Sequence, residues 1–238
     1  AGTAMRSDIE KYAARIRLYH NQHTLPWADK GSRLLPSKLF MEYKQEMNKM
    51  RDGFDNLCDT FFNSYPQLVE DAKIKLGTFY DAADYPPLDE VRQKFGFRLA
   101  IDPIPSAGDF RLDVSNTELE ELKQSYEAKF DERLNEAMGT AWARLHELLT
   151  KTSDKLADCG GDAETVKKRY HETLITNAQD LCGMLTKLNV TNDPKLEEAR
   201  RSLELTMLGQ DIESIKDSPH VRSELKDKVD NILKKFEW

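Results

Sequence analysis

The chain has 238 residues, and 32% of them are charged, with 42 acidic and 35 basic residues that leave a net charge of −7. This acidic balance disfavours an extended nucleic-acid interface, which needs a basic face. The sequence also lacks the run of ~20 apolar residues that a membrane-spanning helix requires. We therefore expect a cytoplasmic protein that does not bind membranes.

Glycine and proline are scarce, with 11 and 9 residues, so the composition favours long helices. We predict a mainly α-helical fold: an elongated antiparallel helical bundle with coiled-coil-like hairpins and a small inserted β-hairpin. One elongated domain over residues 5–238 is preferred to two compact ones. Residues 1–4 have the composition of a cloning remnant, and we leave them out of the fold.

The first predicted helix covers residues 7–21, and its start is marked by a Ser-x-x-Glu capping box. Residues 23–36 contain two prolines and a glycine, which predicts an irregular loop with an unusually apolar content. A second helix starts near residue 37 and is expected to end at Pro66, because proline removes a helical hydrogen bond and clashes with the preceding turn.

A third helix is predicted over residues 67–80, followed by a short helical turn over 88–94. Residues 95–101 and 110–114 then show apolar alternation, and the turn-forming residues between them predict a β-hairpin at 95–114 with a proline-stiffened loop. Such a hairpin is marginal by itself and must pack on helices.

The longest predicted helix spans residues 116–159, contains no proline and would extend for roughly 60 Å. Its apolar residues recur in steps of three and four and form one continuous stripe. The stripe consists of Leu119, Leu122, Tyr126, Phe130, Leu134, Ala137, Ala141, Leu145, Leu148, Thr152 and Leu156. A protein built around such a helix is expected to be elongated, which suits a scaffold better than a compact enzyme.

A Gly-Gly turn at 160–161 is expected to end the long helix and to start another over residues 163–188, so that 116–188 forms a long antiparallel helical hairpin. Two further helices are predicted over 194–208 and 219–238. The first begins at an Asp-Pro pair and the second at a Ser-Pro pair, both of which are typical of helix starts.

We assign no catalytic, cofactor-binding or metal-binding residue from the sequence, and we expect the chain not to be an enzyme. Phosphate-binding, dinucleotide-binding and nucleophile-elbow motifs are absent from the sequence. His20 and His23 lack further ligands at a matching spacing, and His146 lacks the second histidine of a zinc-protease helix. Three scattered cysteines are expected to be reduced structural thiols. An enzyme whose site is assembled only by folding is a weaker, third option.

The apolar loop at 23–36 holds the strongest candidates for binding another protein, because aromatic and aliphatic side chains are mixed there with charged ones. The competing interpretation, which we prefer, is that these apolar side chains close the open end of the helical bundle. Two residues of the predicted hairpin complete the set. The candidate partner-binding residues are Trp27, Arg33, Leu34, Leu35, Phe110 and Arg111.

Two basic clusters, at 167–169 and 200–201, leave contact with single-stranded nucleic acid open. Acidic neighbours offset both clusters, so solvated helix faces are the preferred interpretation. An accessory protein of DNA metabolism is therefore our alternative to a protein-binding scaffold. Salt-dependent binding to an oligonucleotide would distinguish the two.

An ordered series of short motifs punctuates nearly all of the chain from residue 24 onward. The series consists of Thr24–Trp27, Arg33–Pro36, Leu76–Gly77, Asp84–Pro86, Pro103–Pro105, Asp109–Arg111 and Leu188–Pro194. In this order the motifs resemble the uncharacterised phage and bacterial family called "domain of unknown function 3150". Members of that family are often encoded beside a MoxR-type AAA+ ATPase and a von Willebrand A-domain protein, which implies an adaptor role and supplies no catalytic residues.

The leading hypothesis is a non-enzymatic helical scaffold or adaptor that binds other proteins in the cytoplasm of a bacterium or a phage-infected host. The resemblance implies a MoxR-type AAA+ ATPase system as the partner. No cofactor is expected, and formation of a homo-oligomer stays open.

Overall fold

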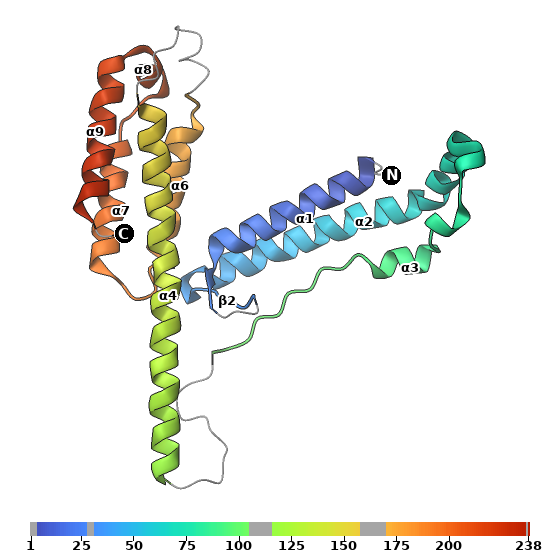
Figure 1. Cartoon of the computed structure of the whole chain (residues 1–238), viewed down its shortest axis with the longest axis horizontal. Helices are drawn as coiled ribbons and strands as arrows, with labels where there is room; N and C mark the ends of the chain where they lie inside the picture. Colours follow the sequence, from blue (N-terminus) through green and yellow to red (C-terminus); the bar gives the residue numbers. More distant parts are fainter. Residues whose placement is uncertain (1–3, 28–30, 105–115, 158–169, 237) are drawn as a thin grey trace. The chain divides into compact units, whose positions relative to one another are not determined.

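The computed structural model describes residues 4–27, 31–104, 116–157, 170–236 and 238. Of the described residues 80% are helical, and this part of the chain contains eight α-helices and one two-stranded antiparallel sheet (Figure 1). The predicted mainly α fold with a small β-hairpin is confirmed. The helices are α1 (Ala4–His23), α2 (Phe40–Leu76), α3 (Leu88–Gln93), α4 (Asn116–Leu156), α6 (Thr173–Leu188), α7 (Pro194–Met207), α8 (Ile212–Asp217) and α9 (Pro219–Lys235), with 3-10 turns η1 (Ser37–Leu39), η2 (Gly77–Phe79) and η3 (Ala82–Asp84).

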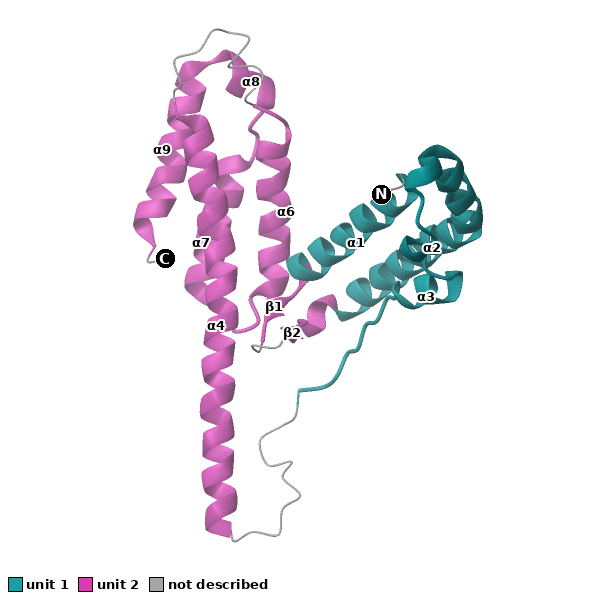
Figure 2. Ribbon diagram, turned by 45° about the vertical axis from the view of Figure 1, so that its right-hand side comes forward, with its two compact units in different colours: residues 1–22, 40–106 teal, residues 23–39, 107–238 magenta. Residues whose placement is uncertain are grey.

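The chain divides into two compact units, which Figure 2 shows in different colours. Unit 1 contains residues 1–22 and 40–106, and unit 2 contains residues 23–39 and 107–238. Each unit has its own set of buried apolar side chains. The single domain expected over residues 5–238 stays a prediction.

In unit 1, α1 and α2 lie side by side in both views (Figures 1 and 2). Ile9 and Ile16 are buried on α1. The chain after α3 returns along α2, where the Phe95 ring packs against Phe61 and Phe62 with centroids 5.6 Å apart in each pair. The remaining buried core of this unit comes mostly from α2: Tyr43, Met47, Met50, Phe54 and Cys58.

The helix break expected at Pro66 is wrong, because α2 continues through this residue. An internal proline costs ~3 kcal/mol, which includes the hydrogen bond that its missing N–H would give to the Phe62 carbonyl. Burial of a phenylalanine contributes about 1.5–3 kcal/mol, and Phe62 is buried. Tyr65 Oη also donates to the Pro86 carbonyl oxygen at 2.8 Å. Tertiary packing therefore joins the two helices predicted on either side of the proline.

The predicted position of the β-hairpin is wrong in its described part, since residues 95–104 contain no strand. Apolar and polar residues do alternate in this segment, but the apolar side chains pack against helices and not within a sheet. Phe95, Phe97 and Leu99 are half-buried, whereas the residues between them are exposed. The remaining predicted residues, 105–114, lie outside the described part of the chain.

The hairpin lies instead in the segment expected to be a loop. Strand β1 (Leu25–Pro26) pairs antiparallel with β2 (Arg33–Leu34), and the Trp27 amide donates to the Ser32 carbonyl oxygen at 3.0 Å. Strands of two residues are too short to show a period-two pattern, so the sequence could not distinguish them from a loop.

In unit 2 the second half of α4 forms an antiparallel bundle with α6, α7 and α9 (Figures 1 and 2). The predicted starts of α7 and α9 are confirmed, because Asp193 and Ser218 cap them by accepting hydrogen bonds from backbone amides. The core of the bundle is made of apolar side chains that include Leu145, Leu149, Leu185, Leu203 and Val229.

Several predicted helix boundaries differ from the structure. The final helix, predicted to reach residue 238, ends at Lys235. α1 begins by Ala4, so Ser7 lies inside the helix and cannot be its cap. The helix expected from residue 163 begins at Thr173 among the described residues, because Tyr170 is buried outside it and donates its Oη to the Lys155 carbonyl oxygen at 2.9 Å. The Gly-Gly turn at 160–161 lies outside the described residues.

The short helix α8, which the sequence analysis missed, is held by a buried arginine. Arg222 on α9 donates from Nη1 to the carbonyl oxygens of Ile215 and Lys216, both at 3.0 Å. Its guanidinium carbon lies 5.7 Å from the centre of the Tyr170 ring. One side chain thus acts as hydrogen-bond donor to two carbonyl groups near the end of α8. The last carbonyl groups of an α-helix have no partner within the helix, so an outside donor stabilises them.

A second buried arginine creates an acid-sensitive contact on α7. Arg200 donates to both carboxylate oxygens of Glu197 at 2.9 Å and to Glu204 at 2.9 Å. The hydrogen bonds from Arg200 are the main cause that lowers the pKa of Glu197 from 4.5 to about 2, and Arg201 adds to the effect. A carboxylate with a lowered pKa stabilises the folded state above its unfolded pKa and loses this contribution as it becomes protonated.

We therefore expect the stability difference between the wild type and Glu197→Gln to be constant above pH ~5 and to shrink as the pH falls from 4.5 towards 2. Urea unfolding at a series of pH values measures it. In an Arg200→Gln background the same substitution should show a much weaker pH dependence. A difference that is independent of pH in the wild-type background would refute the assignment.

Candidate functional site

The β1–β2 hairpin places Trp27 against α4. β1 lies along α4, and its Leu25 is fully buried. Trp27 is half-buried, and its indole meets the Phe130 ring edge to face with centroids 5.3 Å apart. Leu34 and Leu35 are partly buried and pack against the core of unit 2. The three apolar candidates of this loop thus contact their own unit, and a role in binding a partner stays a prediction.

Arg33, the charged candidate of the loop, fastens the hairpin. Its Nε donates to Thr24 Oγ1 at 2.6 Å and its Nη2 to the Thr24 carbonyl oxygen at 3.0 Å. Arg144 of α4 donates to the same carbonyl oxygen at 2.9 Å. Burial lowers the pKa of Arg144, and the charge of Arg33 lowers it further. The candidates Phe110 and Arg111 lie outside the described residues.

The first half of α4 carries an apolar stripe in which no residue is buried. In both views α4 extends beyond the other helices of unit 2 (Figures 1 and 2). No residue of 116–136 is buried, whereas the second half of the helix supplies eight buried residues. We call the apolar residues of this first half the α4 face: Leu119, Leu122, Tyr126, Phe130 and Leu134. Within this set, the Phe130 ring contacts Trp27.

The segment that carries the α4 face has a net negative charge. Residues 116–136 contain seven acidic and three basic side chains, a local net charge of −4. A segment with an apolar stripe and a net negative charge is suited to a partner of opposite charge, because like charges across an interface cost several kcal/mol.

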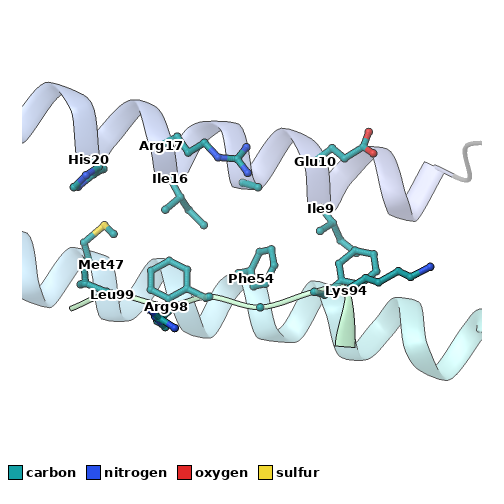
Figure 3. Close-up of a pocket in the computed structure, with 14 residues that line it drawn as sticks. Ile9, Glu10, Ile16, Arg17, His20, Met47, Phe54, Lys94, Arg98 and Leu99 are labelled. Carbon is teal, nitrogen blue, oxygen red and sulfur yellow. The ribbon is translucent and has the colours of Figure 1, made fainter. Parts of the chain in front are cut away.

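Unit 1 contains a groove that the sequence analysis did not anticipate. It is a cavity of about 440 Å³ between α1, α2 and residues 94–99, within the range of 300–1,000 Å³ typical of binding sites (Figure 3). Its apolar lining includes Ile9, Ile16, Met47 and Phe54, which are all buried. The sequence held two signals for this groove: apolar residues at helical spacing in 9–20 and apolar residues at alternate positions in 95–99. Nothing in the sequence shows that these two segments lie next to each other.

Three cations line this groove. Arg17, Lys94 and Arg98 are exposed and form no ion pair within the part of the chain that the structure describes. Glu10, which also lines the groove, is already paired with Arg6 at 2.9 Å. The groove therefore offers apolar walls and a positive rim in a protein whose net charge is negative.

The histidines and cysteines of the described residues form no metal site. These residues hold no group of three or more His, Cys, Asp or Glu side chains placed to bind a metal. His20 Nδ1 lies 2.6 Å from Tyr43 Oη. Cys58 and Cys182 are buried, and burial raises the pKa of each thiol to about 11, while Cys159 lies outside the described residues.

The basic clusters considered for nucleic acid offer little free charge. Arg201 pairs with Glu197 at 2.8 Å, and Arg200 is buried in its own ion pairs. Residues 167–169 lie outside the described part of the chain. Within that part, none of the helices combines the length and apolar character needed to cross a membrane.

Comparisons of the chain with protein-family models, with curated proteins and with solved structures found no significant match. The resemblance to the family of domain of unknown function 3150 stays a prediction.

Proposed function

We propose that this chain is a non-enzymatic helical scaffold or adaptor, and that the α4 face binds an amphipathic helix of another protein. The observation that carries the proposal is the continuation of the apolar stripe of α4 into residues 116–136, where no side chain is buried. In the second half of the same helix the same spacing of apolar residues packs against other helices. The first half offers the same kind of surface to a helix from outside.

The spacing and the charge of the α4 face define the partner. Apolar residues in steps of three and four fit the side chains of a second helix, as in helical bundles and helix-in-groove complexes. The net charge of −4 over residues 116–136 favours a partner helix that carries Lys or Arg. A second copy of this chain would bring the same net negative charge, and nucleic acid would bring phosphate charges, so both are disfavoured.

The partner system that fits this role is the MoxR-type AAA+ ATPase implied by the resemblance, in a bacterial or phage-infected cytoplasm. In such a system the chain would be an adaptor, with binding as its activity. Neither this partner nor this location enters the argument for the α4 face, which depends on exposure, spacing and charge alone.

The proposal predicts tight dependence on two side chains. The probe is a designed three-heptad peptide with leucine at the core positions and lysine beside them, and it should bind the wild-type chain. Leu122→Ser with Phe130→Ser should weaken this binding at least ~10-fold, because aromatic and central apolar side chains dominate such interfaces. Isothermal titration calorimetry measures the affinity. Co-purification with a MoxR-type AAA+ ATPase should be lost in the same variant.

The matched control is Gln124→Ser with Ala128→Ser, on the opposite side of the same helix. It should leave the affinity within about 2-fold, because these positions lie outside the apolar stripe. Both double variants should keep the helical circular dichroism signal, since none of the four residues is buried. Equal binding by the two variants would show that the α4 face is not the site, and no binding of peptide or ATPase to the wild type would overturn the proposed function.

A further inference from the structure

We infer that the groove of unit 1 binds an extended, acidic segment of another polypeptide, which adds as a β-strand to the backbone edge of Gly96–Ala100. The two walls of the groove have matching lengths. On α1 the lining runs from Ile9 to His20, which at 1.5 Å per residue is about 17 Å. From Lys94 to Leu99 an extended chain covers about 17 Å as well. A groove of this shape suits a strand of five or so residues.

The backbone of this segment has hydrogen-bonding capacity that the described residues do not use. Within the described ranges, no N–H or carbonyl group of Gly96–Ala100 forms a hydrogen bond with another part of the chain. The segment is nevertheless anchored, because Phe95 packs on Phe61 and Phe62 and the Phe97 ring lies 6.4 Å from that of Phe54. A held, extended segment with an unpaired edge is the structure to which strand addition occurs.

The cavity next to this edge accepts the side chains of such a strand. A β-strand directs alternate side chains to opposite faces, so every second residue of an added strand would face the cavity. The cavity floor is apolar, with Ile9, Ile16, Met47 and Phe54 (Figure 3). Aliphatic residues at alternate positions of the bound segment would fill it.

The charges around the groove select an acidic segment. In Figure 3 Lys94 lies at the end of the groove near Ile9, and Leu99 and Arg98 lie towards His20. Arg17, Lys94 and Arg98 thus spread along the groove, and none of them forms an ion pair among the described residues. Carboxylates at the outward positions of the strand would meet these cations. This site is in unit 1, so it is independent of the α4 face.

The test uses the full chain labelled with nitrogen-15 and the peptide acetyl-Glu-Val-Glu-Val-Glu-Val-amide. We expect the peptide to shift the amide signals of Gly96–Ala100 and to slow their hydrogen exchange, because new interstrand bonds protect amides. The lysine counterpart, acetyl-Lys-Val-Lys-Val-Lys-Val-amide, should bind at least ~10-fold more weakly. Binding of both peptides with equal affinity would overturn the charge assignment.

Backbone pairing has its own readout. One peptide carries N-methyl groups on its first, third and fifth residues, and another carries them on the second, fourth and sixth. Since alternate residues of a strand point their backbone groups to opposite edges, one of the two should lose binding and the other should keep it. Retained binding by both would show that the backbone is not paired and would overturn strand addition.

Protein variants locate the site. Arg17→Glu with Arg98→Glu should weaken binding of the glutamate peptide at least ~10-fold. Lys73→Glu with Lys75→Glu makes the same change in net charge at exposed positions of α2 outside the groove, and it should change the affinity by less than about 2-fold. Slow exchange of the Gly96–Ala100 amides in the free chain would mean that another segment of the chain, or a second copy if the effect depends on concentration, already occupies the edge. That result would overturn the proposal.

Discussion

Replacing Leu145 by alanine is expected to lower the free energy of unfolding of unit 2 by about 2–5 kcal/mol. Leu145 lies in the second half of α4 and is fully buried in the bundle core. The loss combines the transfer free energy of the removed methyl groups with the cavity that rigid neighbours leave behind. Urea unfolding followed by tryptophan fluorescence measures it, because all three tryptophans of the chain, at 27, 142 and 238, belong to unit 2.

The same substitution in the first half of the helix is the matched control. Leu122 is 37% exposed, and Leu122→Ala should change the free energy of unfolding by no more than about 0.5 kcal/mol. Both variants make the same chemical change in the same α-helix, so helix propensity cancels between them. Comparable losses at the two positions would mean that residues 116–136 are covered, and the α4 face would then be unable to bind a helix.

Replacing Arg222 by alanine is expected to cost about 2–3 kcal/mol. The substitution removes two hydrogen bonds from a charged donor and leaves the carbonyl groups of Ile215 and Lys216 without this partner. It also removes the cation above the Tyr170 ring. Because α8 depends on these contacts, the substitution should increase the rate of amide hydrogen exchange more in α8 than in α4.

Arg201→Ala is the control for the loss of an arginine. The Arg201 side chain is 69% exposed and makes one surface ion pair, so its removal should change stability by less than about 1 kcal/mol. If Arg222→Ala were equally mild, the carbonyl groups of α8 would have found other partners, and the role assigned to the buried guanidinium would be wrong.

Long elements with a strong period were predictable from the sequence. The α4 stripe identified Ala137, Ala141, Leu145 and Leu156 as core residues, and each of them is buried. The capping residues of α7 and α9 were equally readable, because the interaction of a cap is local. The sequence could not show where along α4 the residues of the stripe stop being buried, since that depends on how far the neighbouring helices extend.

Features set by contacts between distant segments were not predictable. The pattern at 95–99 correctly showed an alternating segment, but its apolar side pairs with helices instead of a second strand. The mixture of apolar and charged residues around Arg33 suggested an interface residue. Its guanidinium instead donates hydrogen bonds to Thr24, which precedes the first strand of the hairpin. The groove of unit 1 combines residues more than 70 positions apart, and no local signal announces such a meeting.

The continuity of α4 has a consequence for the kinetics and cost of association. An isolated helix shorter than ~12–15 residues is marginal in water, because starting the first turn is unfavourable while adding a residue to an existing helix is not. Residues 116–136 extend a helix whose other half is fixed in the bundle core. Their helical state therefore needs no separate nucleation event. A partner helix would meet a surface that is already ordered. The free energy of binding would therefore not be reduced by the cost of folding this segment.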